Sequence, residues 1–181
     1  MSAMTFRAGA AVGALICALL LGYGYYLQYV QGLDPCPLCL VQRAFYYAVL
    51  GTLLVASIHA PKSTGAAVYG GFAALFAAGG LAAAGRQVWL QHLPPDKVPQ
   101  CGPDLYYMLD NFPLSKTVRT LVAGTGECAV VDWTFLGLSI AEWSAAWFAA
   151  LFCYAIWLAL RAPRSARPSH VAFPEVDGRY R

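Results

Sequence analysis

Charged side chains are scarce in this sequence. Asp, Glu, Lys and Arg together make up 12% of its 181 residues, about half of the roughly 25% that is usual for soluble globular proteins. Hydrophobic residues make up 59% of the chain, and the mean hydropathy is +0.54. So few polar side chains cannot cover a water-soluble globule, which indicates a membrane protein. The length suits a single domain.

Motifs for several other chemistries are missing as well. The sequence has no internal repeat, no phosphate-binding glycine motif and no nucleotide fingerprint. A covalent haem site needs His directly after the second cysteine of a Cys-x-x-Cys pair, and Leu40 stands there. The net charge of +3 is too small to indicate binding to nucleic acid. We therefore expect neither haem nor a nucleic-acid partner.

Long hydrophobic runs are present, and each approaches or exceeds the roughly 20 residues that a membrane-spanning helix needs. A cleaved signal peptide is the alternative for the first run, but that run is too long and ends in tyrosines typical of a membrane interface. We predict an all-α membrane protein, a four-helix transmembrane bundle in one domain over residues 1–162. A basic tail at 163–181 is expected to be disordered. The predicted spans are residues 8–30, 40–58, 66–90 and 143–160.

Two loops lie on the same side of this bundle, residues 31–39 and 91–142. The second has about fifty residues, too many for a plain turn. Within it, residues 114–122 predict a short amphipathic helix. This helix either lies in the membrane surface or packs on the protein as an ordinary loop helix. Its predicted apolar face consists of Leu114, Val118, Leu121 and Val122.

The distribution of charge predicts the orientation in the membrane. Four spans place both termini on one side, and most basic residues are on that side. The positive-inside rule then puts the termini in the cytoplasm and both loops outside. In a bacterial inner membrane, that outer compartment is the oxidising periplasm. The basic residues on the cytoplasmic side are Arg7, Lys62, Arg161, Arg164, Arg167, Arg179 and Arg181.

Six cysteines are present, and they fall into two groups. Cys17 and Cys153 lie inside apolar runs, where a small buried hydrophobic residue is the simplest interpretation. The other four lie outside the spans or at their ends, so the predicted topology gives them one shared compartment. Four cysteines allow three pairings, and spacing alone does not choose among them. This second group is Cys36, Cys39, Cys101 and Cys128.

The first two of these cysteines lie at the start of the second span. Asp34 suits the N-cap and Pro35 the first helical position, which places Cys36 in the first turn. Free backbone N–H groups at a helix N-terminus favour a thiolate. Arg43 follows Cys39 by four residues, on the same helical face. An arginine in an apolar helix needs a partner, and we expect a thiolate at Cys39 or the oxygen of a bound acceptor.

Less reactive interpretations of these cysteines remain. A structural zinc site needs four ligands, and Cys101 and Cys128 lack the usual close spacing, so we expect no metal. An inert disulfide at Cys36 and Cys39, with Arg43 only reaching the membrane interface, stays open. A bridge between Cys101 and Cys128 is either an exchangeable disulfide or a stabilising one.

A thiol relay also needs a terminal electron acceptor, and the sequence contains no cofactor motif that could serve. A lipid-soluble quinone held among the spans fills this gap. His92 lies near the outer end of the third span, where its ring could hydrogen-bond a quinone oxygen. The alternative is an interfacial histidine that faces water.

Taken together, these motifs resemble the disulfide bond formation protein B (DsbB) family, inner-membrane quinone reductases that reoxidise periplasmic DsbA. The resemblance covers nearly the whole chain. It rests on the four spans, on Cys36-Pro37-Leu38-Cys39 with Arg43, on Gln87 with His92, on Cys101 and Cys128, and on residues 133–138. Gln42 and the Pro37-Leu38 dipeptide are its few departures.

The resemblance implies redox-active disulfides Cys36–Cys39 and Cys101–Cys128. Cys101 would form the mixed disulfide with a DsbA-like thiol oxidase, and Cys128 would then attack Cys36. Cys39 would pass electrons to a quinone, ubiquinone or menaquinone, with Arg43 stabilising negative charge and His92 nearby. The segment 114–122 resembles the family's membrane-lying helix. We expect a monomer surrounded by membrane lipid; a non-enzymatic scaffold with stapled loops is the rival hypothesis.

Overall fold

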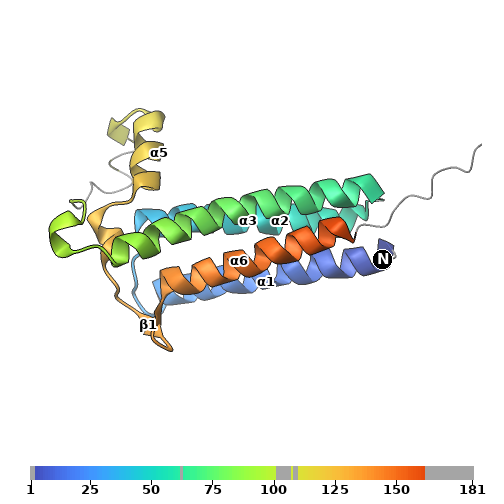
Figure 1. Cartoon of the computed structure of the whole chain (residues 1–181), viewed down its shortest axis with the longest axis horizontal. Coiled ribbons are helices and arrows are strands. Elements are labelled where there is room, and N and C mark those ends of the chain that lie inside the picture. The colour runs from blue at the N-terminus through green and yellow to red at the C-terminus, as the bar shows by residue number, and fades with distance from the viewer. Residues whose placement is uncertain (1–2, 62, 101–106, 108–109, 162–181) are drawn as a thin grey trace, which may run out of the picture.

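Four long helices form the body of the protein and lie alongside one another (Figure 1). The computed structural model describes residues 3–61, 63–100, 107 and 110–161. Within these residues, the four helices are long and apolar enough to cross a membrane, as predicted. Each begins three to five residues before the predicted run, because its first turn contains residues that an apolar run does not include. The helices are α1 (Ala3–Tyr29), α2 (Pro37–His59), α3 (Ser63–Gln91) and α6 (Ile140–Leu160).

The helices pack in the order α1, α2, α3, α6, with the closest association between α3 and α6. Small residues make this association possible. Gly80 on α3 lies against the ring of Phe148 on α6, and Gly70 lies against the backbone of Ala159. A Cβ atom at either glycine would collide with the facing helix. Phe148 also stacks on Tyr46 of α2, with ring centroids 4.0 Å apart, which joins three helices in one core.

Large apolar side chains cover much of the outside of the bundle as well as part of its interior. Leu15, Leu19, Leu54 and Leu75 are each about half exposed or more, whereas many core positions are alanines. A surface of this kind suits helices surrounded by lipid, where outward-facing leucines carry no hydrophobic penalty. Of the two cysteines in apolar runs, Cys17 is buried as predicted, but Cys153 is exposed on this outer surface.

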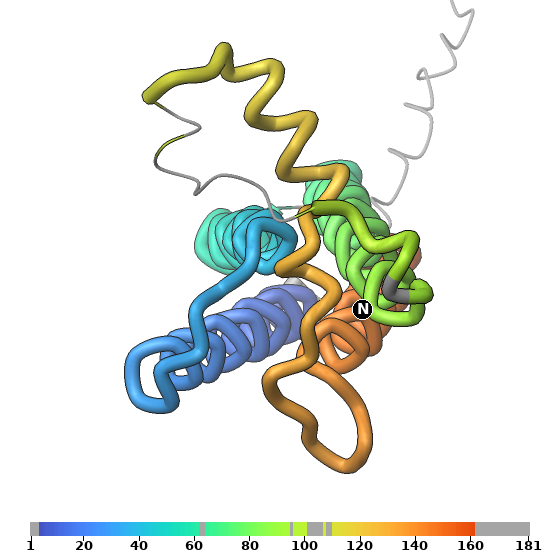
Figure 2. The backbone as a smooth tube through the Cα atoms, turned by 90° about the vertical axis from the view of Figure 1, so that its left-hand side faces the viewer, coloured from blue at the N-terminus to red at the C-terminus, as the bar shows by residue number. Residues whose placement is uncertain are grey.

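The connection between α3 and α6 lies at one end of the bundle, and several short elements divide it. They are η1 (Pro95–Lys97), α5 (Leu114–Ala123), η2 (Gly126–Ala129), β1 (Thr134–Phe135) and β2 (Leu138–Ser139). Figure 2 shows the segment between α5 and α6 crossing the end of the bundle. The turn between α1 and α2 lies at this same end, and the N-terminus lies at the other (Figure 1).

Helix α5 occupies the predicted position, and three of the four residues of its apolar face are exposed, with Leu121 half-buried. Leu114, Val118 and Val122 are 72%, 55% and 55% exposed, whereas Thr117 is buried. The helix runs across the bundle axis rather than along it (Figure 1). The protein residues that the structure describes therefore do not cover the apolar face, which argues against an ordinary loop helix packed by that face.

The hairpin of β1 and β2 was not expected in an all-α chain. Thr134 pairs with Ser139 and Phe135 with Leu138 in antiparallel register. The turn residues Leu136 and Gly137 have φ of 53° and 82°, as a tight hairpin turn requires. Ser139 then caps α6: its side chain accepts from the N–H of Glu142, whose carboxylate accepts from the N–H of Ser139. This reciprocal capping box fixes where the fourth span begins.

Candidate active site

The Cys36–Cys39 turn forms the N-terminus of α2. Cys36 is the N-cap, with extended backbone (φ −64°, ψ 162°), and its sulfur accepts from the N–H of Cys39 at 3.4 Å. The prediction that Asp34 caps the helix is wrong. A residue before proline is driven to extended backbone, and Pro37 imposes this on Cys36. The helix therefore cannot begin before Pro37, and Cys36 stands just outside it.

Three of the four predicted redox cysteines meet at this turn. The sulfur atoms of Cys36 and Cys39 are 2.7 Å apart. The thiol of Cys128, from η2, is hydrogen-bonded to that of Cys36. Cys128 is 0% exposed and packs with Leu38 and Leu90. The long loop and the short turn thus share one cluster of sulfur atoms.

Cys101 lies outside the described residues, so its predicted pairing with Cys128 stays a prediction. The residue before it, Gln100, accepts a hydrogen bond from the N–H of Gly126 at 3.3 Å. Gly126 begins η2, the turn that contains Cys128. The chain is therefore held next to η2 one residue before Cys101.

The pKa values of the Cys36 and Cys128 thiols are shifted in opposite directions. The hydrogen bond from Cys36 lowers the pKa of Cys128 from an ordinary 9.0 to about 6. Burial opposes this change, and the backbone N–H groups of Leu38 and Thr125 reinforce it. The hydrogen bond to Cys128 is also the main reason why the pKa of Cys36 is raised. Because Leu38 lies in the first turn of α2, the free N–H groups of a helix N-terminus stabilise the Cys128 thiolate.

Two buried glutamine side chains complete the surroundings of the sulfurs. The amide nitrogen of Gln87 donates to the sulfurs of Cys36 and Cys39, at 3.3 and 3.4 Å. Its oxygen accepts a 2.7 Å hydrogen bond from the amide of Gln42. From the sequence, Gln42 was only a departure and Gln87 only part of a resemblance. An uncharged polar residue inside an apolar span was the signal that could have identified both.

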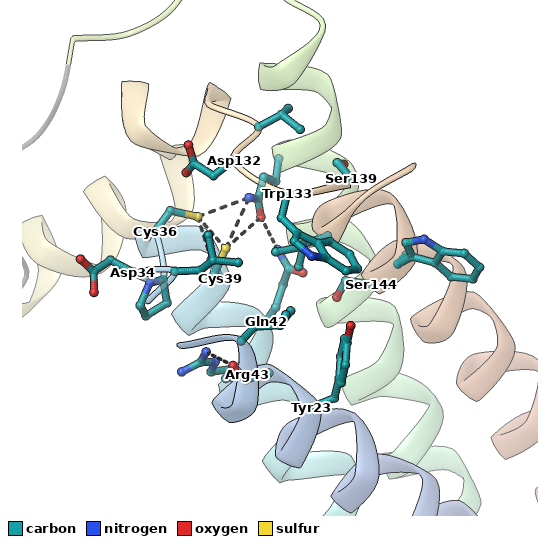
Figure 3. Close-up of a pocket in the computed structure, with 18 of the residues that line it drawn as sticks. Tyr23, Asp34, Cys36, Cys39, Gln42, Arg43, Asp132, Trp133, Ser139 and Ser144 are labelled. Carbon is teal, nitrogen blue, oxygen red and sulfur yellow. Dashed lines mark hydrogen bonds between the residues drawn. The ribbon is translucent and has the colours of Figure 1, made fainter. Parts of the chain in front are cut away.

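The partners of the Arg43 guanidinium lie on α1 rather than at Cys39, so of its two expected partners only the oxygen of a bound acceptor stays a prediction. Its guanidinium donates to the carbonyl of Gly24 at 3.0 Å and to the side chain of Gln28, both on α1. It also lies over the ring of Tyr25, 4.7 Å from the centroid. These neutral acceptors satisfy the charge within the bundle. Figure 3 nevertheless shows Arg43 and Cys39 around the same pocket.

This pocket is a cavity of about 620 Å³ between α1, α2, α6 and the segment before the hairpin. The volume is within the range of small-molecule sites, roughly 300–1,000 Å³. Its polar lining includes Cys39, Gln42 and Arg43, and most of the remaining wall is apolar. The aromatic lining residues are Tyr23, Tyr46, Trp133, Phe135, Trp143 and Trp147.

His92 lies apart from this cavity. It is exposed at the end of α3, where its Nδ1 is 2.8 Å from the carbonyl oxygen of Val88. It is not part of the cavity wall as the structure describes it. Its predicted contact with a quinone therefore receives no support from this geometry. Among the described residues, no group of three or more His, Cys, Asp or Glu side chains could hold a metal ion.

Clustered thiols at the end of a four-helix membrane bundle, beside a largely apolar cavity, define a membrane-bound thiol oxidoreductase. Residues 6–158 match the family model for "Disulfide bond formation protein DsbB". The chain belongs to the DsbB family, and it is a multi-pass membrane protein of disulfide bond formation.

Curated relatives named "Disulfide bond formation protein B" are similar over most of their length. The relative from Azoarcus sp. (strain BH72) is 48% identical over 78% of this chain and 85% of its own length. That from Methylococcus capsulatus is 48% identical over 80% and 88%. That from Chromobacterium violaceum is 41% identical over 89% and 97%.

Proposed function

We propose that this protein reoxidises a periplasmic DsbA-like thiol oxidase by disulfide exchange and passes the electrons to a quinone. The contact between Cys128 of the long loop and Cys36 of the short turn carries this proposal. Two cysteines 92 positions apart in the sequence, hydrogen-bonded at the end of a bundle, are placed for exchange rather than for separate structural bridges.

In the first exchange, a thiolate of the reduced partner attacks the Cys101–Cys128 disulfide at Cys101. The sulfur–sulfur bond opens and Cys128 leaves as a thiolate. The second thiol of the partner then attacks the mixed disulfide and releases Cys101. The partner gains a disulfide, and Cys101 and Cys128 together hold the two electrons it has lost.

In the second exchange, Cys128 attacks the Cys36 sulfur of the Cys36–Cys39 disulfide, and Cys39 leaves as a thiolate. The backbone N–H groups of Leu38 and Thr125 lower the pKa of Cys128 and so favour the thiolate that attacks. Cys101 then attacks Cys128, which restores the Cys101–Cys128 disulfide and releases Cys36. The two electrons now belong to the Cys36–Cys39 dithiol.

The cavity beside Cys39 suits a quinone head group, with Arg43 in its wall to stabilise negative charge on a ring oxygen. A quinone bound there would accept two electrons and two protons from the dithiol and leave as the quinol. Aromatic side chains form much of the apolar lining of the cavity. Apolar walls also suit the tail that keeps such a molecule in the lipid.

The arrangement at the bundle end supports the proposed topology. Both cysteine-bearing connections lie at one end, and the N-terminus and the turn between α2 and α3 lie at the other (Figure 1). We place the cysteine end in the periplasm and the termini in the cytoplasm. Helix α5 then lies in the periplasmic surface of the inner membrane, with its exposed apolar residues in the lipid.

The test measures reduction of a soluble quinone by the purified protein supplied with a reduced DsbA-like oxidase. We expect Cys39→Ser and Cys101→Ser each to abolish turnover, because each interrupts one of the two exchanges. Cys153→Ser is the matched control, since this thiol lies on the outer face of α6. Turnover that survives either of the first two changes would exclude the relay, and a stapled scaffold would give no turnover in any variant.

A further inference from the structure

The amide of Gln87 is the polar group that touches both sulfurs of the Cys36–Cys39 turn. It reaches them from α3, 48 positions further along the chain than Cys39, and its side chain is only 4% exposed. The dashed lines in Figure 3 join this amide to the two sulfurs and to the side chain of Gln42. A buried amide so placed can respond directly to charge on either sulfur.

Gln42 determines which way this amide points. A glutamine amide has a donating and an accepting end, and its neighbours decide which faces which. Gln42 donates to the Gln87 oxygen at 2.7 Å, the shortest hydrogen bond of the group. The oxygen is thereby held toward Gln42, where it also accepts a longer 3.6 Å hydrogen bond from the Cys39 thiol, and the amide nitrogen donates to both sulfurs. Gln42 is 5% exposed and lies one turn below Cys39 on the same helix.

We propose that Gln87 is a catalytic residue whose N–H group stabilises the negative charge on Cys39 as the Cys36–Cys39 bond opens, and that Gln42 is the positioning residue that aims it. The proposal rests on the relay described above and assigns these two glutamines a role in it. When Cys128 attacks Cys36, the electron pair of the broken sulfur–sulfur bond leaves with Cys39. No proton has to move in this step, since the N–H bond of Gln87 stays intact.

The physical reason is a difference in hydrogen-bond strength between the two redox states. Sulfur in a disulfide is a weak acceptor, whereas a hydrogen bond to an ionised group is roughly twice as strong as one between neutral groups. The Gln87 amide therefore favours the reduced pair over the oxidised pair. Because its orientation is already fixed, no reorganisation is needed when the charge appears. The expected result is a Cys36–Cys39 disulfide that accepts electrons from the loop more readily.

The test is a redox titration of the full-length protein in detergent without quinone. The protein is equilibrated with glutathione buffers of graded ratio, and alkylation of the Cys36–Cys39 peptide is measured by mass spectrometry. Gln87→Met keeps a similar shape but removes the donor. We expect it to need about tenfold more reducing buffer for half-reduction, the size of effect for one hydrogen bond to a charged group.

Gln42→Met should act in the same direction but less, by about threefold, because the donor remains and only its aim is lost. The double variant should titrate no lower than Gln87→Met alone, since both changes remove one interaction. Gln91→Met is the matched control. Gln91 lies one turn further along α3, and its amide oxygen accepts a hydrogen bond from the Ser139 hydroxyl. We expect it to titrate with the unmodified protein.

A titration of Gln87→Met that coincides with the unmodified protein would overturn the proposal. Additive effects of the two substitutions would remove the positioning role of Gln42. Neither result would contradict the proposed relay, which the separate quinone-reduction assay tests. If Gln87→Met does not fold, Gln42→Met is the remaining test: the Gln87 amide is still present but no longer oriented, and a titration that coincides with the unmodified protein would overturn the proposal.

Discussion

The two connections at the cysteine end of the bundle hold their thiols in opposite ways. Cys36 is the N-cap of a long helix, and its hydrogen bond to Cys128 raises its pKa. Cys128 lies in a short 3₁₀ turn of the long loop, where the same hydrogen bond lowers its pKa to about 6. The same hydrogen bond thus favours the thiol form of Cys36 and the thiolate form of Cys128.

In the proposed relay, the two cysteines have different parts. When Cys36 and Cys39 form a disulfide, Cys128 is the proposed nucleophile and Cys36 receives the attack. The N–H of Leu38, at the start of α2, helps to stabilise the loop thiolate rather than one of the helix's own cysteines. A helix N-terminus can thus activate a thiol that belongs to another segment.

Removal of the loop nucleophile is the change with the largest expected effect. Cys128→Ser should lower partner-dependent quinone reduction to less than about 1%, because a serine hydroxyl is not ionised at neutral pH and cannot form the disulfide. Direct reduction of the Cys36–Cys39 pair by a small dithiol should remain. Both rates are measured on the purified protein, and loss of the direct reaction as well would show that the two regions do not act separately.

The acidity of Cys128 predicts how its reactivity in the fully reduced protein depends on pH. In this state Cys36 has a thiol that can donate to Cys128, and a pKa of about 6 means that the thiolate is the main form above pH 6. We expect the rate of Cys128 alkylation to be constant from pH 7 to 9 and about tenfold lower at pH 5. Alkylation of the reduced protein, followed by mass spectrometry over this pH range, tests this. A rate that still rises tenfold per unit above pH 7 would indicate an ordinary thiol.

A substitution at Arg43 tests whether quinone binding in the cavity can be weakened without affecting thiol exchange. Arg43→Ala should raise the quinone KM about tenfold, the loss for one charged hydrogen bond, with little change in exchange with the partner. Arg7→Ala is the matched control. Arg7 also joins α1 to α2 through a backbone carbonyl, that of Ser57, but at the opposite end of the bundle. Equal effects of the two variants on KM would mean that Arg43 acts only by holding the helices together.

The smallest expected effect concerns the cap at the N-terminus of α6, which lies at the cysteine end of the bundle. Ser139→Ala removes the cap of α6 and the 2.8 Å hydrogen bond to Gln91. We expect a loss of about 1 kcal/mol in stability, seen as a lower thermal midpoint in detergent, with the Cys36–Cys39 redox titration unchanged. Ser57→Ala, which removes only a bond within one helix, should cost less than about 0.5 kcal/mol. A shifted redox titration in Ser139→Ala would show that the cap of α6 also affects the Cys36–Cys39 redox equilibrium.

Much of this protein follows from local sequence. The four spans could be predicted because a run of about twenty apolar residues can bury its backbone polar groups only as a helix. Helix α5 follows from its amphipathic spacing. The start of α2 was also within reach, since Pro37 excludes helical backbone at Cys36. The choice of Asp34 overlooked that second proline.

The contacts between segments were decided by the tertiary structure. Spans that are apolar on all sides give no periodic signal for which faces meet. The sequence therefore could not show that Gln87 reaches the sulfurs, that Arg43 turns to α1, or that His92 lies outside the cavity. The sequence shows only that Cys128 lies in a long loop. The contact of Cys128 with Cys36 depends on how η2 packs across the end of α2, and no local sequence pattern predicts that packing.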